Sequence, residues 1–139
     1  ASRVPLHVAP GLTECHFGSW ENRPLADISA TTPDWQTLLA RGLLTPEGGE
    51  GFDAFRTRVL AGFAEWMQQA RDSHRVLVSH GGVINGLLHD ILPTERILSF
   101  QVDYTGITRL LSSRSGRLAV AGVNSDEHVW DLLPRNQRW

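Results

Sequence analysis

Residues 75–88 read RVLVSHGGVINGLL: an apolar run leads into Ser79-His80-Gly81-Gly82 and then into a second apolar run. Val76-Leu77-Val78 has no polar alternation, which is typical of a strand covered on both faces in a parallel sheet. The second run predicts a helix over residues 83–91 that ends before Pro93. A buried strand that passes directly into a helix favours an α/β fold with a mostly parallel sheet.

The turn between the two runs suits an anion-binding position. A helix start offers free N–H groups and a positive dipole end, and the imidazole of His80 can meet an anionic group such as a phosphate there. Gly81 carries no Cβ, so a ligand can approach its backbone closely. The alternative is a tight strand-to-helix turn whose histidine lies in the core with its hydrogen bonds made there. The turn alone leaves both interpretations open.

The rest of the chain contains patterns typical of both helices and strands. Apolar residues recur at helical spacing between residues 52 and 71, with Arg56 and Arg58 assigned to the polar face, which predicts an amphipathic helix. We also expect a short strand at 5–8, irregular structure over 12–34, a short helix after Asp34, and a hairpin of strands 107–112 and 118–123. No repeat or domain boundary is visible, so residues 1–139 are expected to form one domain.

Composition excludes several classes of protein. The net charge of −2 provides no basic stripe, so we expect no nucleic-acid partner. No apolar run has the length of a membrane span, so we expect no membrane partner. Cys15 is the only cysteine, which rules out a Cys-rich metal site and favours a reducing, cytoplasmic location.

A second informative stretch covers residues 11–21, GLTECHFGSWE. Phe17 and Trp20 are large apolar anchors in a segment with little regular structure, and Glu14 on such a pinned loop is a candidate positioned acid. In isolation, a solvated surface glutamate beside two packing aromatics is the more common arrangement.

Together the two stretches resemble the histidine phosphatase superfamily, which includes the phosphoglycerate mutases. Its members carry an L-x-E-x-x-F-G-x-W-E loop and, later, a strand that ends in S-H-G-G. The segment from Gly48-Gly49-Glu50 to Arg58-Val59 is similar to the family's G-E-S-x-x-x-F-x-x-R-V, and Asn124 with His128 to its closing N-x-x-x-H. The resemblance implies a phosphoglycerate mutase-like three-layer sandwich.

The resemblance also implies a two-step phosphomonoester hydrolysis through a phosphohistidine. By position, Glu14 matches the acid that protonates the leaving oxygen, and His80 matches the second histidine that stabilises the transferring group, with Gly81 beside it on the phosphate. The substrate would be a small phosphorylated molecule, and no metal or other cofactor is needed. Cys15 after Glu14 and the short span from Glu14 to His80 resemble the phosphatase branch more than the mutases.

The family's nucleophile lies in an R-H-G motif, and an S-x-x-x-R-A segment supplies its second arginine; neither motif occurs in this sequence. We therefore expect the fold to lack its first βα unit, the chain to be inactive alone, and an apolar sheet edge to be open for a homodimer or another pairing. Three explanations remain: a fragment of a longer phosphatase, a non-catalytic relative that binds a phosphorylated ligand or a partner, or a fold recruited to other chemistry with Glu14 and His80 as an acid–base pair.

Overall fold

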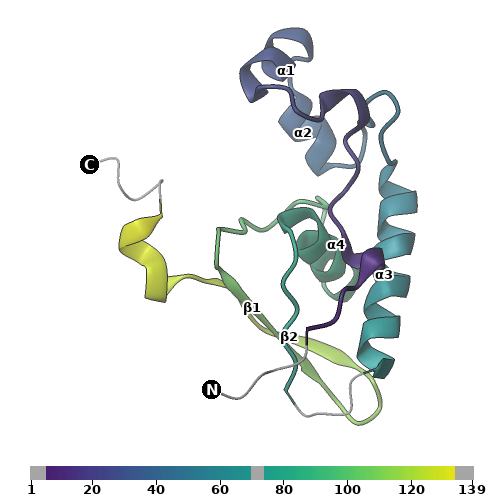
Figure 1. The fold of residues 1–139 in the computed structure, drawn as a ribbon, viewed down its shortest axis with the longest axis vertical. Coiled ribbons are helices and arrows are strands. Elements are labelled where there is room, and N and C mark those ends of the chain that lie inside the picture. Colours follow the sequence, from purple (N-terminus) through teal and green to yellow (C-terminus); the bar gives the residue numbers. More distant parts are fainter. Residues whose placement is uncertain (1–5, 70–73, 134–139) are drawn as a thin grey trace.

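The computed structural model describes residues 6–69 and 74–133. Four helices precede a β-hairpin in the described chain: α1 (Leu25–Thr31), α2 (Trp35–Ala40), α3 (Phe52–Gln69) and α4 (Gly81–Ile91), then β1 (Ile107–Ser112) and β2 (Leu118–Ser125). Short 3-10 turns lie at Pro10–Leu12 (η1), Gly18–Trp20 (η2) and Glu127–Leu132 (η3). In Figure 1 the helices α3 and α4 and the hairpin form the main body, and α1 and α2 lie together at one end.

The core lies where η1, α3 and α4 meet. Gly11 and Gly62 allow η1 to approach α3 closely, because a Cβ on Gly62 would lie 2.9 Å from the Gly11 Cα. The side chains that close this space are all apolar and buried: Leu12, Phe55, Val59, Phe63, Val83 and Leu87. This packing fixes the chain leading into residues 13–21 against the two helices, and so positions the candidate site.

The hairpin packs its second strand against α4. β1 and β2 pair antiparallel, with Leu110 opposite Val120 and Ser112 opposite Leu118, and the register is irregular between Ile107 and Leu110. Among the described residues, these two strands form the only sheet. The predicted hairpin is confirmed, with β2 two residues longer than expected.

The main helices confirm the predicted α/β class. α3 begins at Phe52 as predicted, and the expected final residues 70–71 lie outside the described part. α4 begins at Gly81, two residues earlier than expected, because the glycines of the turn are already helical. The expectation of irregular structure over 12–34 is wrong for Leu25–Thr31, which forms α1 between Pro24 and Pro33.

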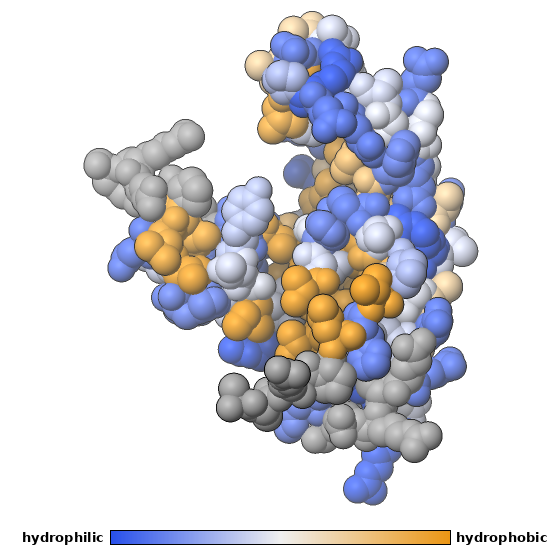
Figure 2. Space-filling view, viewed as in Figure 1, coloured by the Kyte–Doolittle hydropathy of each residue, from blue (hydrophilic) through white to orange (hydrophobic). Residues whose placement is uncertain are grey.

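The predicted cover of Val76–Val78 on both faces is wrong. The segment is extended, and Leu77 packs against the core, yet it belongs to no strand in the structure. Val76 and Val78 are 87% and 90% exposed, and Leu6 and Val8, which belong to no strand in the structure, are 92% and 87% exposed. Figure 2 shows apolar surface gathered in the middle of this face of the molecule. The faces of a strand are covered by elements that pack on them, and in the described part of the chain the core covers only the side on which Leu77 lies.

Candidate active site

A loop that we call the acid loop (residues 11–21) forms one wall of the candidate site. Leu12 is buried and anchors its start, and the Ser79 hydroxyl donates a hydrogen bond to the Leu12 carbonyl at 3.1 Å. Further along, the Glu50 N–H donates to the His16 carbonyl at 2.7 Å. The loop is therefore tied both to the segment before α4 and to the segment before α3.

Glu14 reaches from the acid loop to the first turn of α4. Its Oε2 accepts a hydrogen bond from the Gly82 N–H at 3.0 Å, and its Oε1 accepts one from the Cys15 N–H at 2.8 Å. The α4 N–H groups of the first turn have no partner within the helix, and the dipole favours negative charge there. A Cβ on Gly82 would overlap the Glu14 carboxylate, so a larger residue at this position requires that carboxylate to shift.

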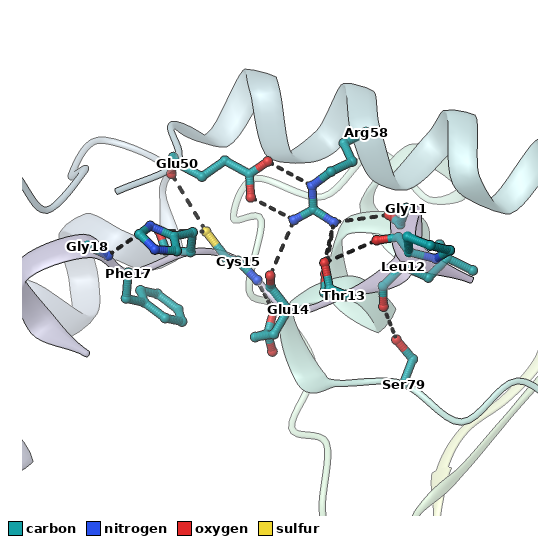
Figure 3. Close-up of polar contacts among 12 residues, drawn as sticks. Gly11, Leu12, Thr13, Glu14, Cys15, Phe17, Gly18, Glu50, Arg58 and Ser79 are labelled. Atoms are coloured by element: carbon teal, nitrogen blue, oxygen red, sulfur yellow. Dashed lines mark hydrogen bonds and ion pairs between the residues drawn. The ribbon is translucent and has the colours of Figure 1, made fainter. Parts of the chain in front are cut away.

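Arg58 extends from α3 toward the acid loop and bonds to three of its backbone carbonyls (Figure 3). Its guanidinium also pairs with the Glu50 carboxylate through two hydrogen bonds of 2.9 and 2.7 Å. The bonds from Arg58 hold the pKa of Glu50 below its ordinary value of 4.5, and those from Glu50 raise the pKa of Arg58. Both groups are therefore charged at neutral pH.

Cys15 lies between these charges. Its Sγ is 3.6 Å from the Glu50 carbonyl oxygen. Burial, aided by the nearby Glu50 and Glu14 carboxylates, raises the pKa of the thiol from 9.0 to about 11. A thiol held in the neutral form is a poor nucleophile, so Cys15 is not suited to attack a phosphorus atom.

A cavity of about 580 Å³ opens beside the acid loop. It is lined by residues 13–16, 21 and 48–50 and by Arg58. Arg58 is the only arginine or lysine among these lining residues, and its guanidinium is already bonded to Glu50 and to the loop carbonyls. Among the described lining residues, the cavity therefore has acidic and backbone groups. Its one arginine is already paired, so no arginine or lysine there is free to neutralise a phosphate.

His80 is the N-cap residue of α4 and its side chain is exposed. It lies two residues before Gly82, the residue bonded to Glu14, so the backbone brings the two predicted site segments together. His80 does not line the cavity. Gly81 begins α4, and its carbonyl accepts a hydrogen bond from the buried Asn85 amide at 3.0 Å. The roles assigned to Glu14, His80 and Gly81 stay predictions.

The described residues contain no group of three or more His, Cys, Asp or Glu side chains able to hold a metal ion. In the same part of the chain, every buried side-chain nitrogen and oxygen has a hydrogen-bond partner. No helix among those described is long and apolar enough to cross a membrane.

The sequence interpretation placed Arg58 on the solvent face of its helix, and this is wrong. The side chain is 28% exposed, and its guanidinium carbon lies 5.3 Å from the centre of the Phe55 ring. A signal was available: Arg58 is three residues after Phe55 and one before Val59, so it borders the apolar stripe of α3.

Comparison with known proteins supports the resemblance seen in the motifs. The family model described as "Histidine phosphatase superfamily (branch 1)" matches residues 1–125. The adenosylcobalamin/alpha-ribazole phosphatase of Escherichia coli K12 is 32% identical over 111 residues, which are 73% of this chain and 52% of that protein. The Salmonella typhimurium enzyme of the same name is 34% identical over 72% of this chain and 52% of its own length. The chain thus spans about half the length of these curated relatives.

Solved structures show the same fold. The alpha-ribazole phosphatase from Shigella flexneri matches with a TM-score of 0.71 and 26% identity over 88% of this chain and 62% of that one. A phosphoserine phosphatase mutant from Entamoeba histolytica matches with a TM-score of 0.72 and 22% identity, over 91% of this chain and 65% of the other; at that identity the likeness concerns the fold alone.

Proposed function

The chain belongs to the histidine phosphatase superfamily, and we propose that it contributes the proton donor and a charge-stabilising histidine to a phosphomonoester hydrolase. The observation that carries this proposal is the contact of the Glu14 carboxylate with the Gly82 N–H, two residues after His80. The contact brings a proton-transfer group and an imidazole to the same end of α4.

In the proposed reaction, a phosphate monoester and water give an alcohol and inorganic phosphate. A nucleophilic histidine supplied by further polypeptide forms a P–N bond as the P–O bond to the leaving oxygen breaks, and protonated Glu14 gives its proton to that oxygen. His80 donates a hydrogen bond to the phosphoryl oxygens, whose charge the positive end of α4 also stabilises. Water then releases the phosphoryl group from the histidine that carried it, and the Glu14 carboxylate takes up a proton from that water.

The phosphohistidine step needs a nucleophile that this sequence does not present in an R-H-G setting. None of its six histidines has that surrounding, and the Arg58 guanidinium is committed to Glu50 and the acid loop. We therefore propose that residues 1–139 form the part of one domain that carries the catalytic acid, and that further polypeptide supplies the nucleophile and the phosphate-binding arginines. On this proposal the 139-residue chain is cytoplasmic and inactive alone. A small phosphorylated metabolite is the substrate class we propose.

The test is hydrolysis of p-nitrophenyl phosphate, without added metal, by the full product of the gene. Glu14→Gln and His80→Ala should each lower kcat by about 10²- to 10⁴-fold. Glu47→Gln and His7→Ala, which change exposed residues of the same types outside the site, serve as matched controls and should leave the rate unchanged. Near-normal rates in both site variants would reject the assignment.

The exposed apolar segment at residues 76–78 favours a second candidate function, binding of a partner without catalysis. Residues 76–78 pair with no strand of the described ranges 6–69 and 74–133, and an exposed segment of this kind is a template for strand addition. We propose a second copy of this chain as the occupant, because antiparallel pairing of this segment with its own copy covers Val76 and Val78 on both protomers. Light scattering should then give a dimer mass that Val78→Lys returns to monomer; a monomeric wild-type chain would rule this out.

A further inference from the structure

We propose that Arg58, clamped by Glu50, is a positioning residue that places Glu14 on the first turn of α4. The inference rests on the proposed role of Glu14, and it concerns a residue to which no role has been given so far. Arg58 bonds to backbone carbonyls of the acid loop, and through them acts on the backbone that carries the Glu14 side chain.

The hydrogen bonds within the acid loop lie mainly over residues 15–21, whereas the carbonyls of its first part accept from Arg58. Arg58 Nη1 donates to the carbonyls of Gly11 and Thr13, both at 3.0 Å, and Nη2 donates to the carbonyl of Glu14 at 3.3 Å. The Thr13 hydroxyl is a further acceptor at 3.1 Å. One rigid, planar group therefore fixes the backbone on both sides of Thr13 and at Glu14 itself.

Glu50 fixes the orientation of that guanidinium. Its two carboxylate oxygens accept from Arg58 Nε and Nη2, and only 17% of its side chain is exposed. The Glu50 N–H also holds the acid loop, through the His16 carbonyl. Because Glu50 binds Arg58 through two hydrogen bonds between opposite charges, the guanidinium cannot rotate freely. Its remaining N–H donors therefore point at the loop carbonyls.

The two hydrogen bonds of the Glu14 carboxylate require the loop backbone to be held in one position. The carboxylate must meet two N–H groups at once, those of Cys15 and Gly82, which belong to segments 67 residues apart in sequence. A loop displaced by about 1 Å loses the Gly82 contact, since hydrogen bonds weaken steeply outside their normal distance and angle. Arg58 is therefore expected to control where the proton donor lies without taking part in proton transfer.

The experiment follows the backbone amide signals of Gly82 and Cys15 by ¹H–¹⁵N NMR in the 139-residue chain, so it does not depend on turnover. Glu14→Gln defines the signals obtained when the carboxylate is lost. Arg58→Met should shift the Gly82 signal away from its wild-type position and raise its hydrogen-exchange rate by about 10- to 100-fold. Arg58→Lys, which keeps a charge and donors, should fall between Arg58→Met and wild type.

Arg56→Met is the matched control. Arg56 lies on the same helix but pairs with Asp90 on the surface, away from the acid loop. It should leave the Gly82 signal in place. The double variant Glu50→Gln/Arg58→Met removes both partly buried charges together and keeps the test informative if the single change prevents folding.

A Gly82 signal unchanged in Arg58→Met would overturn the proposal. So would an equal rise of exchange at the core amides of Val59 and Leu88, because that would make Arg58 a general stabiliser. In the full gene product, loss of kcat with KM retained in Arg58→Met supports positioning. If Glu14→Gln leaves activity unchanged while the Gly82 signal still depends on Arg58, the proposed function fails and the positioning inference stands.

Discussion

Replacing Gly82 with alanine should destabilise the chain, although alanine is normally the better helix former. Gly82 is the second residue of α4, where the gain from alanine is at most about 1 kcal/mol. A Cβ at this position would overlap Glu14 Oε1 and lie 3.0 Å from its carboxyl carbon, so the carboxylate must leave the Gly82 N–H. A hydrogen bond to a charged group contributes about 1.5–3 kcal/mol. The expected net loss in the free energy of unfolding is therefore about 0.5–2 kcal/mol.

Gly86→Ala is the matched control on the same helix. The nearest atom to a Cβ there is Phe55 Cε1 at 3.5 Å, an ordinary van der Waals contact. This change should be neutral or stabilise by up to about 1 kcal/mol. Urea unfolding followed by far-ultraviolet circular dichroism measures both variants against wild type.

The decisive comparison places Gly82→Ala in a Glu14→Ala background. With the carboxylate gone, alanine meets no obstacle, so the substitution should now stabilise the chain as Gly86→Ala does. The coupling energy between the two positions should be about 1.5–3 kcal/mol. Equal effects of Gly82→Ala in the two backgrounds would refute the contact between the acid loop and α4.

Three further outcomes are expected. Cys15, with a pKa of about 11 in place of 9.0, should react with iodoacetamide at pH 7.5 about 100-fold more slowly in the folded chain than in urea; equal rates would contradict the burial described. Glu50, whose folded pKa lies below 4.5, should stabilise the chain above that pH and lose its contribution as pH falls through the folded value. Glu50→Gln should then flatten the acid side of a plot of urea midpoint against pH, and an unaltered profile would exclude this linkage. Leu88→Ala, at a side chain 1% exposed, should cost about 2–5 kcal/mol in urea unfolding, and a cost under 1 kcal/mol would show that the α4 packing is wrong.

The sequence alone predicted an element correctly where one local pattern determines its structure. The apolar stripe from Phe52 predicted α3 because each of its members packs on the same side of the helix. The turn-forming residues 113–117, which separate the runs 107–112 and 118–123, predicted the hairpin. Pro24 and Pro33 indicate irregular structure when they are considered alone, but a proline before the first turn and another after the last are compatible with the short helix α1.

Contacts between distant segments were harder to predict. The spacing of residues along the chain does not show that Arg58 turns toward the acid loop, because its carbonyl partners lie 44–47 residues earlier in the sequence. Nor does an apolar triplet such as Val76-Leu77-Val78 show which strands accompany it. Glu14 contacts the Gly82 N–H at the start of α4 because Leu12, which is buried, and Leu77, which packs against the same core, precede the two segments; the site roles themselves stay predictions.

The central claim is that Glu14 and His80 serve one phosphate-sized site at the start of α4. Titration of the 139-residue chain with inorganic phosphate, followed through the His80 ring and Gly82 amide signals, tests it most directly. Both signals should move along one saturation curve, with tighter binding in Glu14→Gln, where a like charge is removed, and weaker binding in His80→Ala. Signals that stay fixed at millimolar phosphate, or binding that ignores both substitutions, would contradict the account.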